Sequence, residues 1–273
     1  MSTATPLTAA ELQPRPGSRL YWAVADAAVL AKRHLVQIPR FPELLVFATV
    51  QPVMLVILFR YVFGGSIDVG NVSYVNYLMA GIFVQTVAFG SVATGVGLAD
   101  DLTKGLIDRF RSLPMSRSAV LTGRTVADLA RNMFVVVVML LVGLLVGFRP
   151  DAGVFDWLAA IGLLLLLSFA FSWLGASVGL LVRTVEAAQS GGFIWLFPLT
   201  FTSSAFVRPE NMAGWLRPFA ENQPFSVIVD AVRGFFLNQP VGSKGWMALA
   251  WLAGLILVFA PLSVRLYEKR TAH

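Results

Sequence analysis

Two long runs without a charged residue flank a short, densely charged segment in this chain of 273 residues. Residues 69–99 and 132–148 carry no Asp, Glu, Lys or Arg, whereas residues 100–117 read DDLTKGLIDRFRSLPMSR. Apolar runs that cross a bilayer do so as helices, because backbone N–H and C=O groups find no water in lipid. A segment as charged as 100–117 is excluded from lipid and is predicted to be a loop at a membrane face.

Composition indicates the same class of protein. Hydrophobic residues make up 57% of the chain and charged residues only 13%, which is far from a typical soluble domain. The net charge of +6 comes from basic residues beside the apolar runs, which is typical of contact with anionic lipid headgroups and not of a nucleic-acid surface. The chain has no cysteine, which excludes disulfides and thiolate chemistry.

Six apolar runs are long enough to cross the hydrocarbon core of a bilayer. They lie at residues 44–63, 77–99, 119–148, 157–182, 187–207 and 245–264. The predicted fold class is therefore an all-α integral membrane protein with six transmembrane helices. Residues 1–18 are predicted to be a disordered cytosolic tail, and residues 19–273 to form one transmembrane domain.

Residues 19–40 are predicted to form an amphipathic helix on the membrane surface. One stripe is apolar and contains Leu20, Val24, Ala27, Ala31, Leu35 and Ile38. Basic side chains at Lys32, Arg33 and Arg40 suit an anionic inner leaflet. The alternative is an ordinary amphipathic helix that packs on protein.

The basic residues also predict the orientation, because a positively charged flank resists translocation. With a cytosolic N-terminus, fourteen Lys and Arg residues beside the spans fall inside and five fall outside. Both termini and the charged segment 100–117 are therefore predicted to be cytosolic in a multi-pass protein of the cell membrane.

Residues 208–242 are too polar to cross lipid and too regular for a plain loop. Pro209 starts a helical pattern that Pro218 and Pro224 interrupt. After Pro224, an apolar stripe recurs at Phe225, Val229, Val232 and Phe236. We expect two short helices at the outer face before the last span.

Catalytic and metal-binding signals are weak throughout. The histidines are His34 and His273, which are far apart in sequence, and neither GxxxxGK[ST] nor a Gly-rich turn after a strand occurs. If the protein uses ATP, another chain binds it. A membrane-embedded lipid-modifying enzyme would need clustered His, Asp, Glu or Ser at a membrane face, and a stand-alone channel would need polar faces along several spans.

Polar residues inside the predicted spans are the better functional candidates, because lipid disfavours them. Asp128 and Arg131 are three residues apart and either pair with each other or line a solvated entrance. Gln85 suits a helix contact or a substrate surface equally. Gly175 and Gly179 match the small-xxx-small spacing that lets membrane helices approach closely.

The charged segment has helical periodicity of its own. Leu102, Leu106 and Phe110 recur every four residues, charges of both signs fall on other faces, and Pro114 ends the pattern. An apolar ridge with mixed charge favours docking into a protein groove, while a surface helix without a partner remains the alternative.

The chain resembles the type-2 ATP-binding-cassette (ABC) permeases, and among them the daunorubicin-resistance, DrrB-like group, from about residue 20 to its end. The blocks that carry the resemblance are GLIDRFRSLPMSR at 105–117, GRTVADLARN at 123–132, GLLVGFRP at 143–150, and SSAFVRPENMAGWLRPFAENQPFSVIVDAVRG at 203–234. The resemblance implies six transmembrane helices, an N-terminal interfacial helix, a cytosolic coupling helix and paired short extracellular helices before the last span.

The resemblance also implies partners. Two permease chains would join two cytosolic ATPase subunits, which bind ATP and Mg²⁺, so that no cofactor belongs to this chain and no catalytic residue is expected in it. The coupling contact would involve Asp101, Lys104, Leu106, Asp108, Arg109, Phe110 and Arg111. Family members export hydrophobic drugs, lipids or glycolipids, so membrane lipids and a hydrophobic substrate are further expected partners. Candidates for the substrate pathway are Gln85, Phe83, Phe89, Phe193, Trp195 and Phe201; for the aromatic residues, packing between helices is the alternative.

Overall fold

The computed structural model describes residues 25, 28–29, 31–32, 42–64, 67, 69, 72–105 and 117–271. The elements within these residues are helical: α2 (Pro42–Leu58), the π-helix η2 (Phe59–Phe63), α3 (Tyr74–Thr103), α5 (Arg117–Val146), α6 (Val154–Leu181), α7 (Val185–Phe201), the 3-10 helix η3 (Pro209–Asn211), α8 (Arg217–Asn222), α9 (Pro224–Phe236) and α10 (Ser243–Thr271). The predicted tail at 1–18, most of the predicted surface helix at 19–40 and residues 106–116 of the charged segment lie outside the described residues.

Four helices are long and apolar enough to cross a membrane. They span Tyr74–Thr103, Leu121–Val146, Val154–Leu181 and Ser243–Arg270, and they correspond to four of the six predicted runs. The other two runs form α2 with η2, and α7. Helix α7 has 17 residues, and the apolar helical stretch of α2 with η2 is Ala48–Phe63. Both are shorter than the roughly 20 residues that a perpendicular span needs. The count of six spans therefore stays a prediction.

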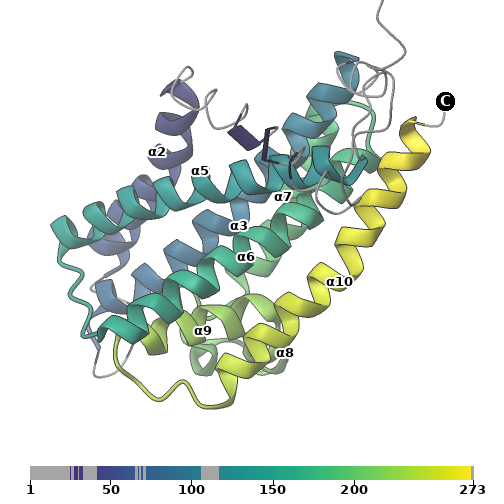
Figure 1. The fold of residues 1–273 in the computed structure, drawn as a ribbon. Helices are drawn as coiled ribbons and strands as arrows, with labels where there is room; N and C mark the ends of the chain where they lie inside the picture. Colours follow the sequence, from purple (N-terminus) through teal and green to yellow (C-terminus); the bar gives the residue numbers. More distant parts are fainter. Residues whose placement is uncertain are drawn as a thin grey trace, which may run out of the picture.

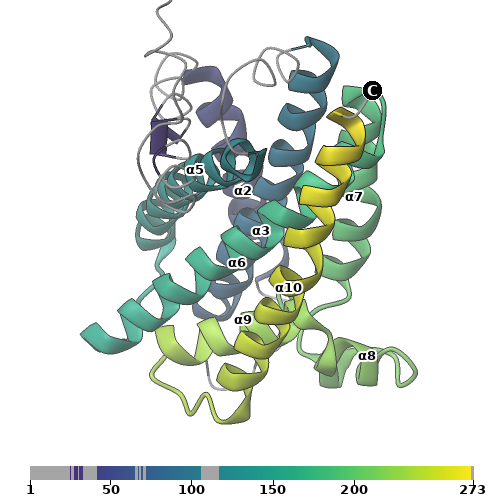
Figure 2. The same cartoon turned by 45° about the vertical axis from the view of Figure 1, so that its right-hand side comes forward.

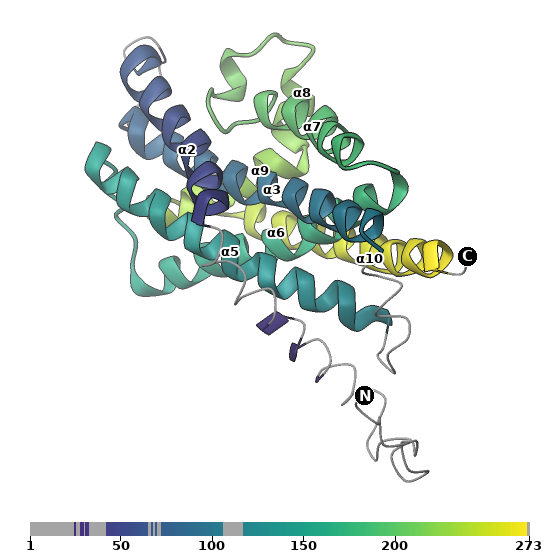
Figure 3. The same ribbon diagram turned by 90° about the horizontal axis from the view of Figure 1, so that it is seen from above.

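Helix α3 is the centre of the bundle. It packs against α5, α6, α7 and α9, and 67% of its most apolar 18-residue stretch is buried inside the protein. Figure 3 shows α3 between α5 and α7. In Figure 1, α8, α9 and the start of α10 lie at the bottom, while the C-terminus lies at the opposite, upper end. We call the bottom the α9 end, and the opposite end, where α3 ends and α5 begins, the loop end.

Glycines allow α3 and α6 to touch backbone to backbone. A Cβ atom on Gly95 of α3 would lie 2.6 Å from the carbonyl oxygen of Gly175 on α6, which is closer than real Cβ atoms come. Gly179 likewise faces Gly95 directly. The spacing of Gly175 and Gly179 predicted a close helix approach, and the partner is α3 of the same chain.

The end of α7 shows why the predicted run 187–207 does not form one helix. Helix α7 stops at Phe201, although the sequence stays apolar beyond it. The Ser203 hydroxyl accepts a hydrogen bond from the amide of Ala205 (3.1 Å), and the amide of Ser204 donates to the hydroxyl of Ser226 (3.1 Å). These bonds compete with the helical ones and turn the chain toward α9.

Helix α9 begins at Pro224 and buries the predicted apolar stripe. Phe225, Val229, Val232 and Phe236 are all buried, so the predicted amphipathic face is confirmed. The Phe236 ring contacts Phe148 and Trp157 with centroid distances of 5.9 Å and 5.0 Å. Figure 2 shows that α8, unlike α9, projects sideways from the bundle.

The C-terminal helix α10 is attached to the end of α6 at the loop end. The guanidinium of Arg270 on α10 donates hydrogen bonds to the carbonyl oxygens of Leu180 (3.0 Å), Leu181 (3.2 Å) and Val182 (2.9 Å). The last carbonyl groups at a helix C-terminus have no hydrogen-bond partner within the helix, and a cation there also interacts favourably with the helix dipole. Arg270 therefore caps α6 and fixes the end of α10 on it.

Candidate functional site

The predicted coupling residues begin at the loop end, where the structure describes two of them. Lys104 follows the last turn of α3 and donates a hydrogen bond to Asp100 (2.7 Å), which raises the pKa of the exposed Lys104 above its ordinary value. Asp101 forms an ion pair with Arg124 of α5. The remaining predicted coupling residues lie outside the described residues: Leu106, Asp108, Arg109, Phe110 and Arg111.

The Asp101–Arg124 pair is the first contact of a polar ladder that joins α3 to α5 and then to α6. The second rung is the Thr94 hydroxyl, which donates to the carboxylate of Asp128 (2.6 Å). The third is Arg131, which donates to the carbonyl oxygen of Gly90 (2.9 Å). The ladder continues to α6 through the side-chain amide of Asn132, which donates to the Ser168 hydroxyl (2.8 Å).

Asp128 and Arg131 also pair with each other, as one of the two sequence interpretations predicted. The distance between the carboxylate and the guanidinium is 3.2 Å, and their side chains are 9% and 20% exposed. With Thr94 and Gly90 as further partners, both ions are satisfied by protein groups. Removing one partner of a buried pair commonly costs about 3–5 kcal/mol, because the other charge is left uncompensated.

Two glycines of α3 make room for the ladder. A Cβ atom at Gly97 would overlap the guanidinium of Arg124, and one at Gly90 would overlap the side-chain amide of Asn132. The side chains of α5 therefore lie directly on the backbone of α3. Beside the last rung, Asn132 and Ser168 border a shallow hollow between α3, α5 and α6, whose other walls are apolar.

Two of the predicted pathway residues, Phe89 and Phe193, are in ring contact across the seam between α3 and α7. The ring of Phe89 on α3 lies 5.7 Å from that of Phe193 and 5.5 Å from that of Phe197 on α7. Trp195 contacts Phe171 of α6 at 5.8 Å. Farther along α7, Phe201 stacks against Phe197 at 5.6 Å.

Gln85 lies in the same seam. Helices α3 and α7 are antiparallel, with Gly81 against Ala205 and Val92 against Gly192. That register places Gln85 at the height of Thr200. The two side chains are 4% and 0% exposed, and neither the amide oxygen of Gln85 nor the hydroxyl of Thr200 has a hydrogen-bond partner.

Phe83 lies elsewhere, in the aromatic core of the α9 end. Its ring is 1% exposed and lies 6.0 Å from Phe148 and 5.5 Å from Phe236. The predicted pathway set is thus divided between the α3–α7 seam and a closed core.

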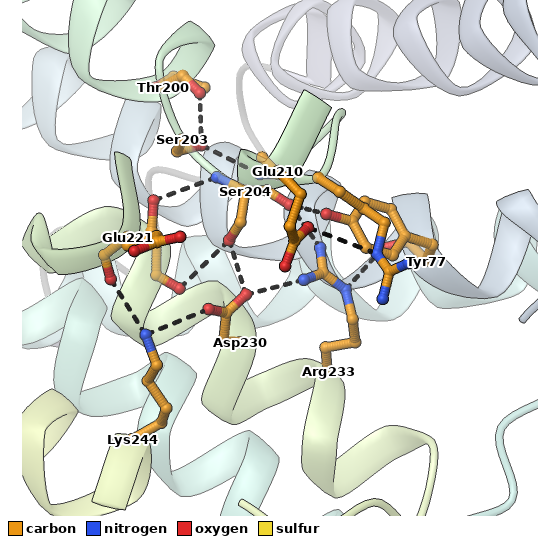
Figure 4. A network of polar contacts seen from close by, with 12 residues as sticks. Tyr77, Thr200, Ser203, Ser204, Glu210, Glu221, Asp230, Arg233 and Lys244 are labelled. Atoms are coloured by element: carbon orange, nitrogen blue, oxygen red, sulfur yellow. Dashed lines mark hydrogen bonds and ion pairs between the residues drawn. The ribbon is translucent and has the colours of Figure 1, made fainter. Parts of the chain in front are cut away.

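Sequence reasoning missed a second polar cluster, at the α9 end. We call it the Arg233 cluster, and its members are Tyr77, Ser204, Asp230, Arg233 and Lys244 (Figure 4). The guanidinium of Arg233 donates to the carbonyl oxygens of Tyr77 (3.2 Å) and Ser204 (2.7 Å) and to the carboxylate of Asp230 (2.9 Å). It also lies 3.6 Å from the centre of the Tyr77 ring, in cation–π contact.

Asp230 is the hub of this cluster. Figure 4 shows it between Arg233 and Lys244, and the distance from its carboxylate to the Lys244 ammonium is 3.6 Å. The Ser204 hydroxyl donates to the same carboxylate at 2.7 Å. The cluster therefore joins α3, the turn after α7, α9 and α10. The sequence signal is the i, i+3 spacing of Asp230 and Arg233, whereas the charge count uses Arg233 only as one of the five cations on the outer side.

The part of the chain that the structure describes holds no group of three or more His, Asp or Glu residues placed to bind a metal ion. The charged side chains of its two polar clusters form ion pairs and hydrogen bonds with other protein groups. The candidate site therefore consists of helix contacts: the polar ladder at the loop end and the α3–α7 seam.

Comparison with known proteins agrees with these features. The family model described as "ABC-2 type transporter" matches residues 26–237. A daunorubicin resistance ABC transporter permease protein of Streptomyces coeruleorubidus is 34% identical over 259 residues, which cover 94% of this chain and 92% of the relative. A probable doxorubicin resistance ABC transporter permease protein of Mycobacterium tuberculosis is 28% identical over 277 residues, covering 96% and 97%.

A more distant relative is a putative transport permease of Porphyra purpurea, 24% identical over 222 residues, which cover 80% of this chain and 76% of the relative. These proteins are transporter permease subunits and not enzymes, and the family implies association with an ATP-binding subunit. The family match covers the polar ladder, the α3–α7 seam and the whole of α9. The chain is a membrane protein that belongs to the ABC-2 type transporter family.

Proposed function

We propose that this chain is the transmembrane permease subunit of an ATP-driven exporter. Its substrate would be hydrophobic or amphiphilic, such as a drug, lipid or glycolipid, and would leave the cell. The observation that carries this proposal is similarity along nearly the whole chain to permeases named for daunorubicin and doxorubicin resistance. The aromatic lining of the α3–α7 seam suits a substrate of that kind.

The working complex would contain two copies of this chain and two cytosolic ATPase subunits, which bind ATP and Mg²⁺. The charged segment 100–117 would supply the contact with the ATPase, with both termini in the cytosol and the spans in the cell membrane. The excess of Lys and Arg beside the predicted cytosolic ends of the spans supports this orientation.

The substrate would pass along the α3–α7 seam. A buried oxygen without a hydrogen-bond partner costs about 1–3 kcal/mol, and the seam contains two, on Gln85 and Thr200. Separation of α7 from α3 would let these oxygens accept hydrogen bonds from a substrate or from water. The closed seam is thus disfavoured by its polar atoms and favoured by its aromatic contacts, which suits a surface that opens and closes.

The test is ATP-dependent transport of radiolabelled daunorubicin by proteoliposomes that contain the permease and its ATPase. Gln85→Leu and Thr200→Val each remove one polar group from the seam with little change in volume. We expect the KM for daunorubicin to rise by about tenfold for either change, the equivalent of one hydrogen bond. ATP hydrolysis without substrate should persist.

Thr125→Val is the matched control. Thr125 is also a buried threonine of a long helix, but its hydroxyl donates to the Leu121 carbonyl of its own helix, at 2.8 Å and away from the seam. An unchanged KM in both seam variants would refute the pathway. Failure of the wild-type chain to co-purify with an ATPase would refute the permease function itself, whereas absence of daunorubicin transport in an assembled complex would refute only daunorubicin as its substrate.

A further inference from the structure

The ladder at the loop end has a regular register. Gly90 faces Asn132, Thr94 faces Asp128, and Gly97 faces Arg124. Each step is about one helical turn on both helices, and the partners run in opposite directions along the chain. The contacts therefore cross-link α3 and α5 over successive turns, beginning directly beside residues 105–116.

This register opposes sliding of one helix along the other. If α5 moved by one turn toward the α9 end, Asp128 would leave the Thr94 hydroxyl and Arg124 would leave both Gly97 and Asp101. Asp101 and Arg124 would then lose each other as charged partners, and Asp128 would keep only Arg131 of its own helix. The end of α3 and the start of α5 are thus held as one rigid unit.

The unit also has a connection to a third helix. Asn132 lies one position after Arg131 and donates to Ser168 of α6, and both side chains are at least 96% buried. On its other face, α3 touches α6 backbone to backbone at Gly95 and Gly175. A displacement of the loop end of the α3–α5 pair is therefore passed to α6 at two places.

We propose that the polar ladder is the element that transmits motion from the coupling segment into the membrane helices, with Arg124 and Asp128 as positioning residues. This inference rests on the proposed function. It also assigns Asp101 a different role from the one that the family resemblance implies: Asp101 acts within the chain, on Arg124, and not on the ATPase. Arg124 is in turn held over Gly97, so the pair joins the coupling segment to the helices.

The decisive experiment exchanges the charges of the first rung. Asp101→Arg and Arg124→Asp are made singly and together, in the permease co-purified with its ATPase and placed in proteoliposomes. Daunorubicin transport and ATP hydrolysis are measured in the same sample. We expect each single change to lower the number of molecules transported per ATP by about tenfold while the complex stays assembled. The double exchange should restore the ratio to within about twofold of the wild type.

Asp128→Asn tests a rung that no ATPase can reach, because the Asp128 side chain is 9% exposed within the bundle. It keeps the shape of the side chain and removes the charge, so it should lower transport per ATP while co-purification is unchanged. Thr125→Val, on the same helix and equally buried, is the control and should keep the wild-type ratio.

Each outcome decides the inference. Rescue by the double exchange, together with a lowered ratio in Asp128→Asn, supports it. Loss of ATPase association in Asp101→Arg without rescue places Asp101 at the ATPase and overturns it, as does a wild-type ratio in the single variants. If the exchanged pair does not fold, Asp128→Asn decides alone. Failure of the wild-type chain to co-purify with any ATPase refutes the permease function as well, which separates the two failures.

Discussion

Among the described residues, Arg233 is the most buried Lys or Arg side chain, and replacing it should destabilise the α9 end. Its side chain is 9% exposed and makes three hydrogen bonds as well as a cation–π contact. Arg233→Met keeps an unbranched apolar stem of similar length but removes all four polar contacts. The change therefore tests the polar cluster and not the packing of the stem.

The size of the effect follows from the partners that remain. Breaking a buried ion pair costs about 3–5 kcal/mol when the other charge is left alone. Asp230 is not left alone, because it keeps the Ser204 hydroxyl at 2.7 Å and the Lys244 ammonium at 3.6 Å, and it is 27% exposed. The carbonyl oxygens of Tyr77 and Ser204 also lose the guanidinium as a hydrogen-bond donor, but they are neutral backbone groups and leave no uncompensated charge. We expect a loss of about 3 kcal/mol in the free energy of unfolding.

The assay is unfolding in mixed detergent micelles, followed by circular dichroism, with Arg217→Met as the matched control. Arg217 also pairs with an acidic residue of its own short helix, Glu221 at 2.6 Å, but the two side chains are 48% and 37% exposed. Exposed pairs of this kind contribute little to stability, so the control should unfold like the wild type. Equal unfolding of Arg233→Met and Arg217→Met would refute the reasoning.

Two further predictions concern helix packing. Gly175→Ala should clearly lower the thermal stability, because the new Cβ atom would overlap the Ser91 carbonyl oxygen. Gly254→Ala, with no atom within 4 Å of its Cβ position, should be neutral or stabilise the protein by about 0.5–1 kcal/mol. A smaller loss for Gly175→Ala than for Gly254→Ala in a thermal melt would contradict the close α3–α6 contact. Arg270→Gln should let the last turn of α6 open, which would be measured as faster hydrogen exchange of the backbone amides in that turn. The control Lys269→Gln should leave this exchange unchanged. Equal exchange in both variants would rule out the cap.

Local patterns predicted those parts of the fold that depend on neighbouring residues. The apolar stripe of α9 follows from helical periodicity after Pro224, and its burial confirms it. The Asp128–Arg131 pair follows from i, i+3 spacing and is present at 3.2 Å. In both cases the residues lie on one helix, so the helical repeat alone predicts how they are placed relative to one another.

Contacts between distant segments could not be predicted in the same way. Arg124 and Asp101 are 23 residues apart, and their meeting depends on the register of two antiparallel helices that no spacing rule encodes. Arg233 lies 156 residues from Tyr77, and its burial depends on carbonyl oxygens supplied by other segments. The charge count therefore treats it only as one of the five cations on the outer side. The early end of α7 depends likewise on Ser226, which accepts a bond that the helix would otherwise need.

The burial of α3 has a consequence for how the chain enters the membrane during synthesis. This helix has the lowest mean hydropathy of the four long ones, and 67% of its most apolar stretch is buried inside the protein. It carries buried Gln85, Thr86 and Thr94, which lipid would not accept and which only neighbouring helices shield. Its main neighbour, α6, is made later. We therefore expect α3 to leave the insertion machinery slowly and to depend on the helices that follow it for stable residence in the bilayer.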